Sequence, residues 1–235
     1  MAREPLINII LFALFPVTAG VAMVLDEPFI ITLVTKAAIL ALAGVGLNIA
    51  LGLGGLVSFG HAAFFGIGGY AMGVLASHAQ SYTPIMETPI LIEGTKSMLV
   101  IWGVAVVAAA LAALLIGVLS LRTTGVYFIM ITLAFGQMLY YFAISWPAYG
   151  GEDGLSIYIR NDFPGLNTLD PIQFFAIAFT VLAAVLFIAG RLAKAPFGLA
   201  LSAARQNPER VETVGVAPFR LRLVAFIISG AVTGL

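Results

Sequence analysis

Few side chains in this sequence could do chemistry, and they are scattered. The 235 residues contain no cysteine and two histidines, which excludes a thiol nucleophile and a cysteine-ligated metal. Five isolated polar side chains stand in otherwise apolar stretches: Asn48, Ser58, His61, Thr132 and Gln137. Because no carboxylate lies near His61 in the sequence, neither a metal site nor a proton relay is expected there. We therefore expect no metal, no resident cofactor and no catalytic residues, so the chain is not predicted to be an enzyme.

The composition shows which solvent surrounds these side chains. Hydrophobic residues make up 61% of the sequence and charged residues 9%, and the mean hydropathy is +1.09. Soluble domains are about half apolar and about a quarter charged. So few charges could not cover the surface of a water-soluble domain. The sequence therefore predicts an integral membrane protein.

Six apolar runs are long enough to cross about 30 Å of hydrocarbon as helices. They are Leu6–Leu25, Phe29–Leu51, Ser58–Ser77, Met98–Leu121, Val126–Trp146 and Ile172–Gly190. The first run is longer than the core of a secretory signal, about 7–15 residues, which favours an uncleaved span. A seventh run, Leu223 to Leu235, extends only about 20 Å at about 1.5 Å per residue, so further residues are expected to complete it. We predict one all-α domain over residues 1–235, with six complete transmembrane helices and a seventh truncated at the C-terminus.

The charged residues predict an orientation. If the N-terminus is cytoplasmic, eight basic residues lie inside, only Lys96 and Arg160 lie outside, and Lys36 falls within a span, as the positive-inside rule requires. The inside set is Arg3, Arg122, Arg191, Lys194, Arg205, Arg210, Arg220 and Arg222. The outside acidic set is Asp26, Glu27, Glu87, Glu93, Glu152, Asp153, Asp162 and Asp170. The polar outer loop from Trp146 to Pro171 is either a solvated connector or a docking surface for an external partner.

Glycines concentrate in the stretch that joins the second and third runs. Small residues at Gly66, Gly69 and Gly73 are typical of faces where helices pack closely in lipid. The cluster from Gly52 to Gly60 allows a second interpretation, a broken helix, which is tolerated at membrane depth only inside protein or beside a cavity. A break there would place Asn48, Ser58 and His61 near a polar path. Thr132 and Gln137 either line this path or bridge helices.

The inner segment, residues 191–222, predicts two short helices. The first covers Leu199–Gln206, Asn207 and Pro208 interrupt it, and the second covers Glu209–Gly215 and ends at the glycine. One interpretation is a helix that rests on lipid headgroups through its arginines. A proline-interrupted pair of short helices followed by another span fits better with a knob that inserts into a cytoplasmic partner.

Three segments together resemble one family. The first is Gly46-Leu47-Asn48 followed by Ser58 to Gly66, and the second is Leu121 to Phe128 leading to Thr132-Leu133-Ala134-Phe135-Gly136-Gln137. The third runs from Phe197 through Arg205, Glu209 and Gly215 to Phe226. In order and spacing they are similar to permeases of ABC importers for branched-chain amino acids, of the LivM type.

The resemblance implies a permease subunit in the bacterial cell inner membrane. It would pair with a second homologous permease, two cytoplasmic ATP-binding-cassette ATPases and a periplasmic substrate-binding protein. Segment 191–222 would be the cytoplasmic coupling segment, with its contacts to an ATPase at Arg205, Asn207, Glu209, Arg210 and Gly215. Many importers have Glu-Ala-Ala ahead of the glycine, whereas here Arg210 and Val211 follow Glu209. Relatives of this kind also carry urea, short amides or other amino acids.

The remaining function classes are distinguished by what the sequence lacks. No Gly-Lys pair is present, so the chain has no phosphate-binding loop and ATP would be bound by partner subunits. An ion-driven secondary transporter is the main alternative, and such proteins usually couple ions through intramembrane carboxylates. None of the six predicted spans contains Asp or Glu. A passive channel would leave the inner pair of short helices unexplained. No nucleic-acid partner is expected from a net charge of zero.

Overall fold

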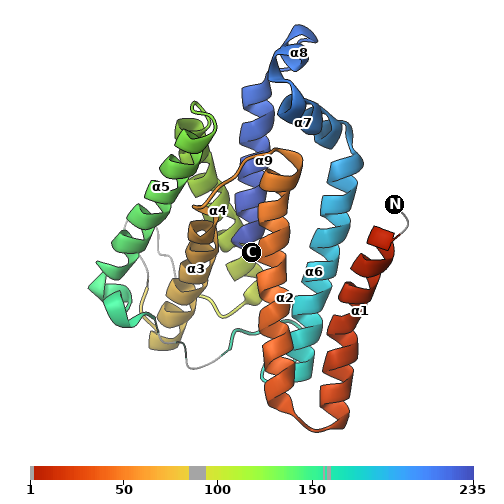
Figure 1. Cartoon of the computed structure of the whole chain (residues 1–235). Coiled ribbons are helices and arrows are strands. Elements are labelled where there is room, and N and C mark those ends of the chain that lie inside the picture. The colour runs from red at the N-terminus through yellow and green to blue at the C-terminus, as the bar shows by residue number, and fades with distance from the viewer. Residues whose placement is uncertain (1–2, 85–93, 156, 158–159) are drawn as a thin grey trace.

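A computed structural model describes residues 3–84, 94–155, 157 and 160–235, and every long element in them is a helix (Figure 1). The helices are α1 (Arg3–Val24), α2 (Pro28–Asn48), α3 (His61–Ser81), α4 (Met98–Ser120), α5 (Val126–Ile144), α6 (Pro171–Lys194), α7 (Pro196–Gln206), α8 (Pro208–Thr213) and α9 (Pro218–Thr233). A π-helix, η1 (Ile49–Leu53), extends α2, and two short 3-10 turns, η2 (Pro147–Tyr149) and η3 (Gly151–Asp153), follow α5.

Proline sets the start of five helices. Each of α2, α6, α7, α8 and α9 has a proline in its first turn, where the missing N–H removes no helical hydrogen bond. At α6 the Asp170 carboxylate also accepts a hydrogen bond from the Ile172 N–H at 3.0 Å, which caps the helix. Local sequence signals therefore explain where most of these helices begin.

Five helices in the described residues are long and apolar enough to cross a membrane: Pro28–Leu53, His61–Ser81, Met98–Ser120, Val126–Ile144 and Pro171–Lys194. A shorter apolar stretch, Ile10–Val24, lies in α1. The predicted all-helical membrane bundle is thus confirmed as a fold class. Two boundaries differ from the predicted runs, because the chain from Gly54 to Gly60 is not helical and α3 begins at His61, whereas α9 begins at Pro218, ahead of Leu223.

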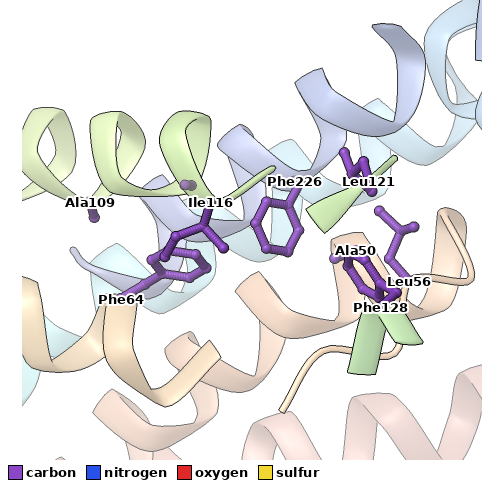
Figure 2. Close-up of a cluster of buried hydrophobic side chains, with 9 residues drawn as sticks. Ala50, Leu56, Phe64, Ala109, Ile116, Leu121, Phe128 and Phe226 are labelled. Carbon is purple, nitrogen blue, oxygen red and sulfur yellow. The ribbon is translucent and has the colours of Figure 1, made fainter. Parts of the chain in front are cut away.

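Helix α9 lies inside the bundle, between α2 and α4, and α3 packs against α4 (Figure 1). The aromatic side chain of Phe226 occupies the middle of the largest buried cluster. Figure 2 shows this ring between Phe64 of α3 on one side and Leu121 and Phe128 on the other. The described end of the chain, Leu235, consequently lies halfway along the neighbouring helices.

The two ends of the bundle carry different loops. The helices α7 and α8 and the α4–α5 turn, which contains Arg122, lie toward one end, whereas α1 begins about midway along the bundle (Figure 1). The α1–α2 turn with Asp26 and Glu27, and the loops after α3 and α5, lie toward the other. The fold therefore separates the predicted inside and outside segments. Glu87 and Glu93, which were assigned to the outside set, lie outside the described residues.

Candidate functional site

The helix is interrupted between α2 and α3, which is the second of the two interpretations that the glycine cluster allowed. After η1, Leu56 N–H donates to the Ala50 carbonyl at 3.0 Å and Gly55 adopts a left-handed φ of 68°. The following residues are extended, with Leu56 and Ser58 buried and Val57 and Phe59 exposed. Within the described residues, the backbone N–H groups of Val57, Ser58 and Phe59 donate to no protein acceptor. Unpaired backbone groups are not stable in lipid, so the open side of this segment must face protein or water.

His61, the first residue of α3, ties three helices together. Its Nε2 lies 2.6 Å from the Ser229 hydroxyl on α9, and that hydroxyl donates to the Gly46 carbonyl on α2 at 2.5 Å. A hydroxyl has one proton, and here it goes to Gly46, so Ser229 Oγ must accept from a protonated Nε2. This leaves Nδ1 as the acceptor nitrogen of His61. It is buried and has no hydrogen-bond partner in the described part of the chain.

Aromatic rings surround this histidine. The imidazole makes edge contacts with Phe64 at 5.1 Å and with Phe226 at 5.5 Å between ring centroids. Phe226 in turn contacts Phe128 of α5 at 6.0 Å. The polar network is thus enclosed in an apolar environment, in which each of its hydrogen bonds is costly to lose.

The other predicted path residues lie around the break but in different environments. Ser58 is buried and its hydroxyl has no hydrogen-bond partner among the residues that the structure describes, whereas the buried Thr132 donates its hydroxyl to the Ile129 carbonyl at 2.9 Å. The backbone of Thr132 lies directly against Gly60. Asn48, on the last turn of α2, and Gln137, next to Gly136 on α5, are exposed. The fold therefore brings Ser58, His61 and Thr132 to one place and leaves the two amides on open surfaces.

Arg205, whose contact with a partner ATPase stays a prediction, makes a hydrogen bond within this chain. Its Nη1 donates to the Gly52 carbonyl in η1 at 2.6 Å. The side chain of Arg205 also lies against Gly55. The contact joins the end of α7 to the start of the break, although 153 residues separate Arg205 from Gly52.

The remaining coupling residues build α8. The Asn207 side chain accepts from the Arg210 N–H at 3.1 Å and caps the helix, and Gly215 ends it with a φ of 88°. Glu209 and Arg210 are exposed. None of the residues of α8 is buried, and the following Val214 is 80% exposed. The predicted pair of short helices is present, and the second projects from the end of the bundle (Figure 1).

The predicted packing glycines occupy two faces of α3. Gly66 and Gly69 have open space around them within this chain, and Gly73 is in ordinary contact with Leu155. A closer contact lies at Gly68, where an added Cβ would collide with the backbone of Gly234, the residue that follows α9. A packing role for Gly66 and Gly69 therefore stays a prediction about a neighbouring subunit.

Ser229 and Arg222 on α9 were missed from the sequence. Ser229 and Thr233, like Gly230 and Gly234, are small residues four apart, the spacing that marks close helix contacts in membranes. Attention to this repeat would have identified the face of α9 that meets Gly46. Arg222, whose Nη2 donates to the Ala204 carbonyl at 3.1 Å, carried no such signal.

Comparison with known proteins identifies the family. Residues 29–235 match the family described as branched-chain amino acid transport system / permease component. The protein named high-affinity branched-chain amino acid transport system permease protein LivM of Escherichia coli (strain K12) is 28% identical over 228 residues, which cover 87% of this chain and 50% of that protein. The protein of the same name from Salmonella typhimurium (strain LT2) is 27% identical over the same shares. No solved structure matches this chain.

These matches confirm the resemblance stated from the motifs. The chain spans about half the length of the curated relatives it matches. The family is one of transport permeases, which also confirms that the chain is not assigned to an enzyme class. The chain belongs to the branched-chain amino acid transport permease family, as a multi-pass membrane protein.

Proposed function

We propose that this chain is the permease subunit of an ATP-binding-cassette importer, and that it alternates between outward-facing and inward-facing states. The observation that carries this proposal is α8, a projecting helix with no buried residue, whose neighbour α7 packs against α6, α9 and η1. An exposed apolar side chain at Val214, together with exposed charges at Glu209 and Arg210, suits insertion into a groove on another protein. Two cytoplasmic ATPases are the partners that this family membership implies.

The solute path runs beside the break between α2 and α3. Unpaired backbone groups at Val57–Phe59 and the unpartnered polar atoms of Ser58 and His61 support this placement. Asn48, Thr132 and Gln137 complete the set of polar groups that we assign to the path. A second homologous permease would cover the exposed side of the segment and the glycine face of α3 at Gly66 and Gly69.

The proposed location is a bacterial inner membrane with the N-terminus in the cytoplasm. The basic residues at the α7–α8 end of the bundle support this orientation. In this arrangement α1 is the first span, and α9 is a further span that starts at the cytoplasmic face. A periplasmic binding protein would dock at the opposite end.

The proposed substrates are branched-chain amino acids, as the names of the two LivM relatives suggest. The experiment is uptake into vesicles that contain this chain with its cognate permease, ATPases and binding protein. Labelled leucine should enter, and excess isoleucine or valine should compete, whereas urea and acetamide should not. Competition by urea or a short amide, without competition by valine, would assign the importer to a different substrate.

A further inference from the structure

The contact between Arg205 and η1 has the geometry of a helix cap supplied by a distant part of the chain. The carbonyls at the end of a helix lack helical partners, and a cation there is stabilising. No backbone N–H in the described residues donates to the Gly52 carbonyl, and the guanidinium of Arg205 takes that place at 2.6 Å. Arg205 thus completes the C-terminal end of the α2–η1 helix.

The lack of a side chain at Gly55 leaves room for Arg205. An added Cβ at Gly55 would lie 2.9 Å from Cγ, 3.0 Å from Cδ and 3.2 Å from Nε of Arg205. Its φ of 68° is also one that other residues rarely adopt. The aliphatic part of the Arg205 side chain therefore packs against Gly55, and its guanidinium donates to the Gly52 carbonyl.

Helix α9 holds the same region from the other side. Arg222, in the first turns of α9, donates to the carbonyl of Ala204, the residue before Arg205. Further along α9, Ser229 donates to the Gly46 carbonyl, one turn before η1, and accepts from His61 just after the break. The helix pair α7–α9 therefore contacts α2–η1 at two carbonyls, Gly46 and Gly52, on either side of the point where the helix becomes a π-helix.

Single π-helical turns inside α-helices occur frequently at functional sites. We propose that Arg205 is a positioning residue for transport. It transfers movement of the α7–α8 segment to η1, and the position of η1 determines whether the Gly54–Gly60 segment leaves the solute path open. This inference rests on the proposed function, because it takes the ATPases as the source of that movement. Arg205 then acts on the chain's own break and not on the ATPase surface.

The test uses the absence of cysteine from this chain. Phe59→Cys, at an exposed position in the break, gives a single thiol whose labelling by a small maleimide is read on this chain's own gel band. The assembled importer is labelled with and without ATP, in an otherwise unchanged background and with Arg205→Ala or Arg205→Lys. Arg220→Ala is the matched control, since Arg220 is exposed and makes no hydrogen bond or ion pair within the described residues.

We expect ATP to change the rate at which the thiol of Phe59→Cys is labelled, both in the unchanged background and with Arg220→Ala. In Arg205→Ala the response to ATP should be lost and uptake should fall about tenfold, the effect of losing one charged hydrogen bond. Arg205→Lys should keep part of both, because the lysine ammonium retains the positive charge and can donate to the Gly52 carbonyl. The amount of ATPase that co-purifies should be the same in all variants.

Two outcomes would overturn the proposal in distinguishable ways. An ATP response that persists in Arg205→Ala contradicts the positioning role of Arg205 and leaves the importer function intact. Loss of co-purifying ATPase in Arg205→Ala and Arg205→Lys would indicate that Arg205 contacts the ATPase. That result would also contradict the positioning role. No ATP response in any background, including the unchanged one, would contradict the proposed function itself.

Discussion

Among single residues, Ser229 makes the contacts that join α2, α3 and α9. Its hydroxyl bonds at once to His61 and to the Gly46 carbonyl, and 168 and 183 residues respectively separate these partners from it in the sequence. Removing one partner of a buried hydrogen bond costs more free energy than the bond contributed, because the other partner is left buried and unsatisfied. Ser229 is therefore the residue whose change should disturb the junction of α2, α3 and α9 most.

Ser229→Ala is expected to lower the stability of the purified subunit by about 1–2 kcal/mol. The reason is that the His61 Nε2–H would be buried without an acceptor. Thermal unfolding of the detergent-solubilised protein would measure this, with Ser202→Ala as the control, since Ser202 makes no hydrogen bond in the described residues. The double variant His61→Phe with Ser229→Ala should recover part of the loss. Equal unfolding temperatures for Ser229→Ala and Ser202→Ala would contradict the network.

At the scale of helices, two neighbouring glycines of α3, Gly68 and Gly69, give a matched pair of substitutions. Gly68 lies against Gly234, the residue that follows α9, so Gly68→Ala forces two backbones apart, and overpacking costs about 1–3 kcal/mol. Gly69→Ala adds a methyl group to open space in this chain. We expect Gly68→Ala to lower the unfolding temperature of the subunit and Gly69→Ala to leave it unchanged. The opposite order would mean that α3 is rotated from the position described.

The same helix tests the proposed contact between permease subunits. If a second permease covers Gly66 and Gly69, Gly69→Leu should reduce the recovery of the two-permease complex and leave the single subunit folded. Size-exclusion chromatography of the co-expressed subunits would show this. Normal recovery of the complex would place that face of α3 against lipid.

Helix α8 makes a separate prediction about coupling. Gly215→Val places a β-branched residue at a φ of 88°, and Glu209→Lys reverses an exposed charge. Each should lower uptake and abolish the stimulation of ATP hydrolysis by loaded binding protein, while insertion in the membrane is kept. The ATPase rate with and without binding protein measures this. Unchanged stimulation in both variants would show that α8 is not the docking element.

The sequence predicted the elements better than it predicted their contacts. Proline and glycine mark the α7–α8 pair and the break after η1, because these residues act on the local backbone. The bond between Arg205 and Gly52 depends on how α7 folds back over η1, which no local pattern encodes. Gly68 and Gly69 are neighbours with the same composition signal, and only the rotation of α3 decides which one meets α9.

At the scale of the whole molecule, the two ends of the bundle should lie on opposite sides of the membrane. A reporter that is active only outside the cytoplasm should be active when fused after Gly154 and silent when fused after Asn207. The physical reason is the excess of basic residues at the α7–α8 end. The reverse pattern would place α8 where no cytoplasmic ATPase could reach it.

The central claim is that movement of this chain is driven by ATP through partner subunits. The most direct measurement is uptake of labelled leucine into vesicles that contain the complete importer and loaded binding protein, under two conditions. With ATP and no ion gradient, uptake is expected to proceed, and in ATP-depleted vesicles with a proton or sodium gradient it is expected to stop, because no predicted span carries a carboxylate to couple an ion. Uptake that persists without ATP and follows the ion gradient would contradict the account.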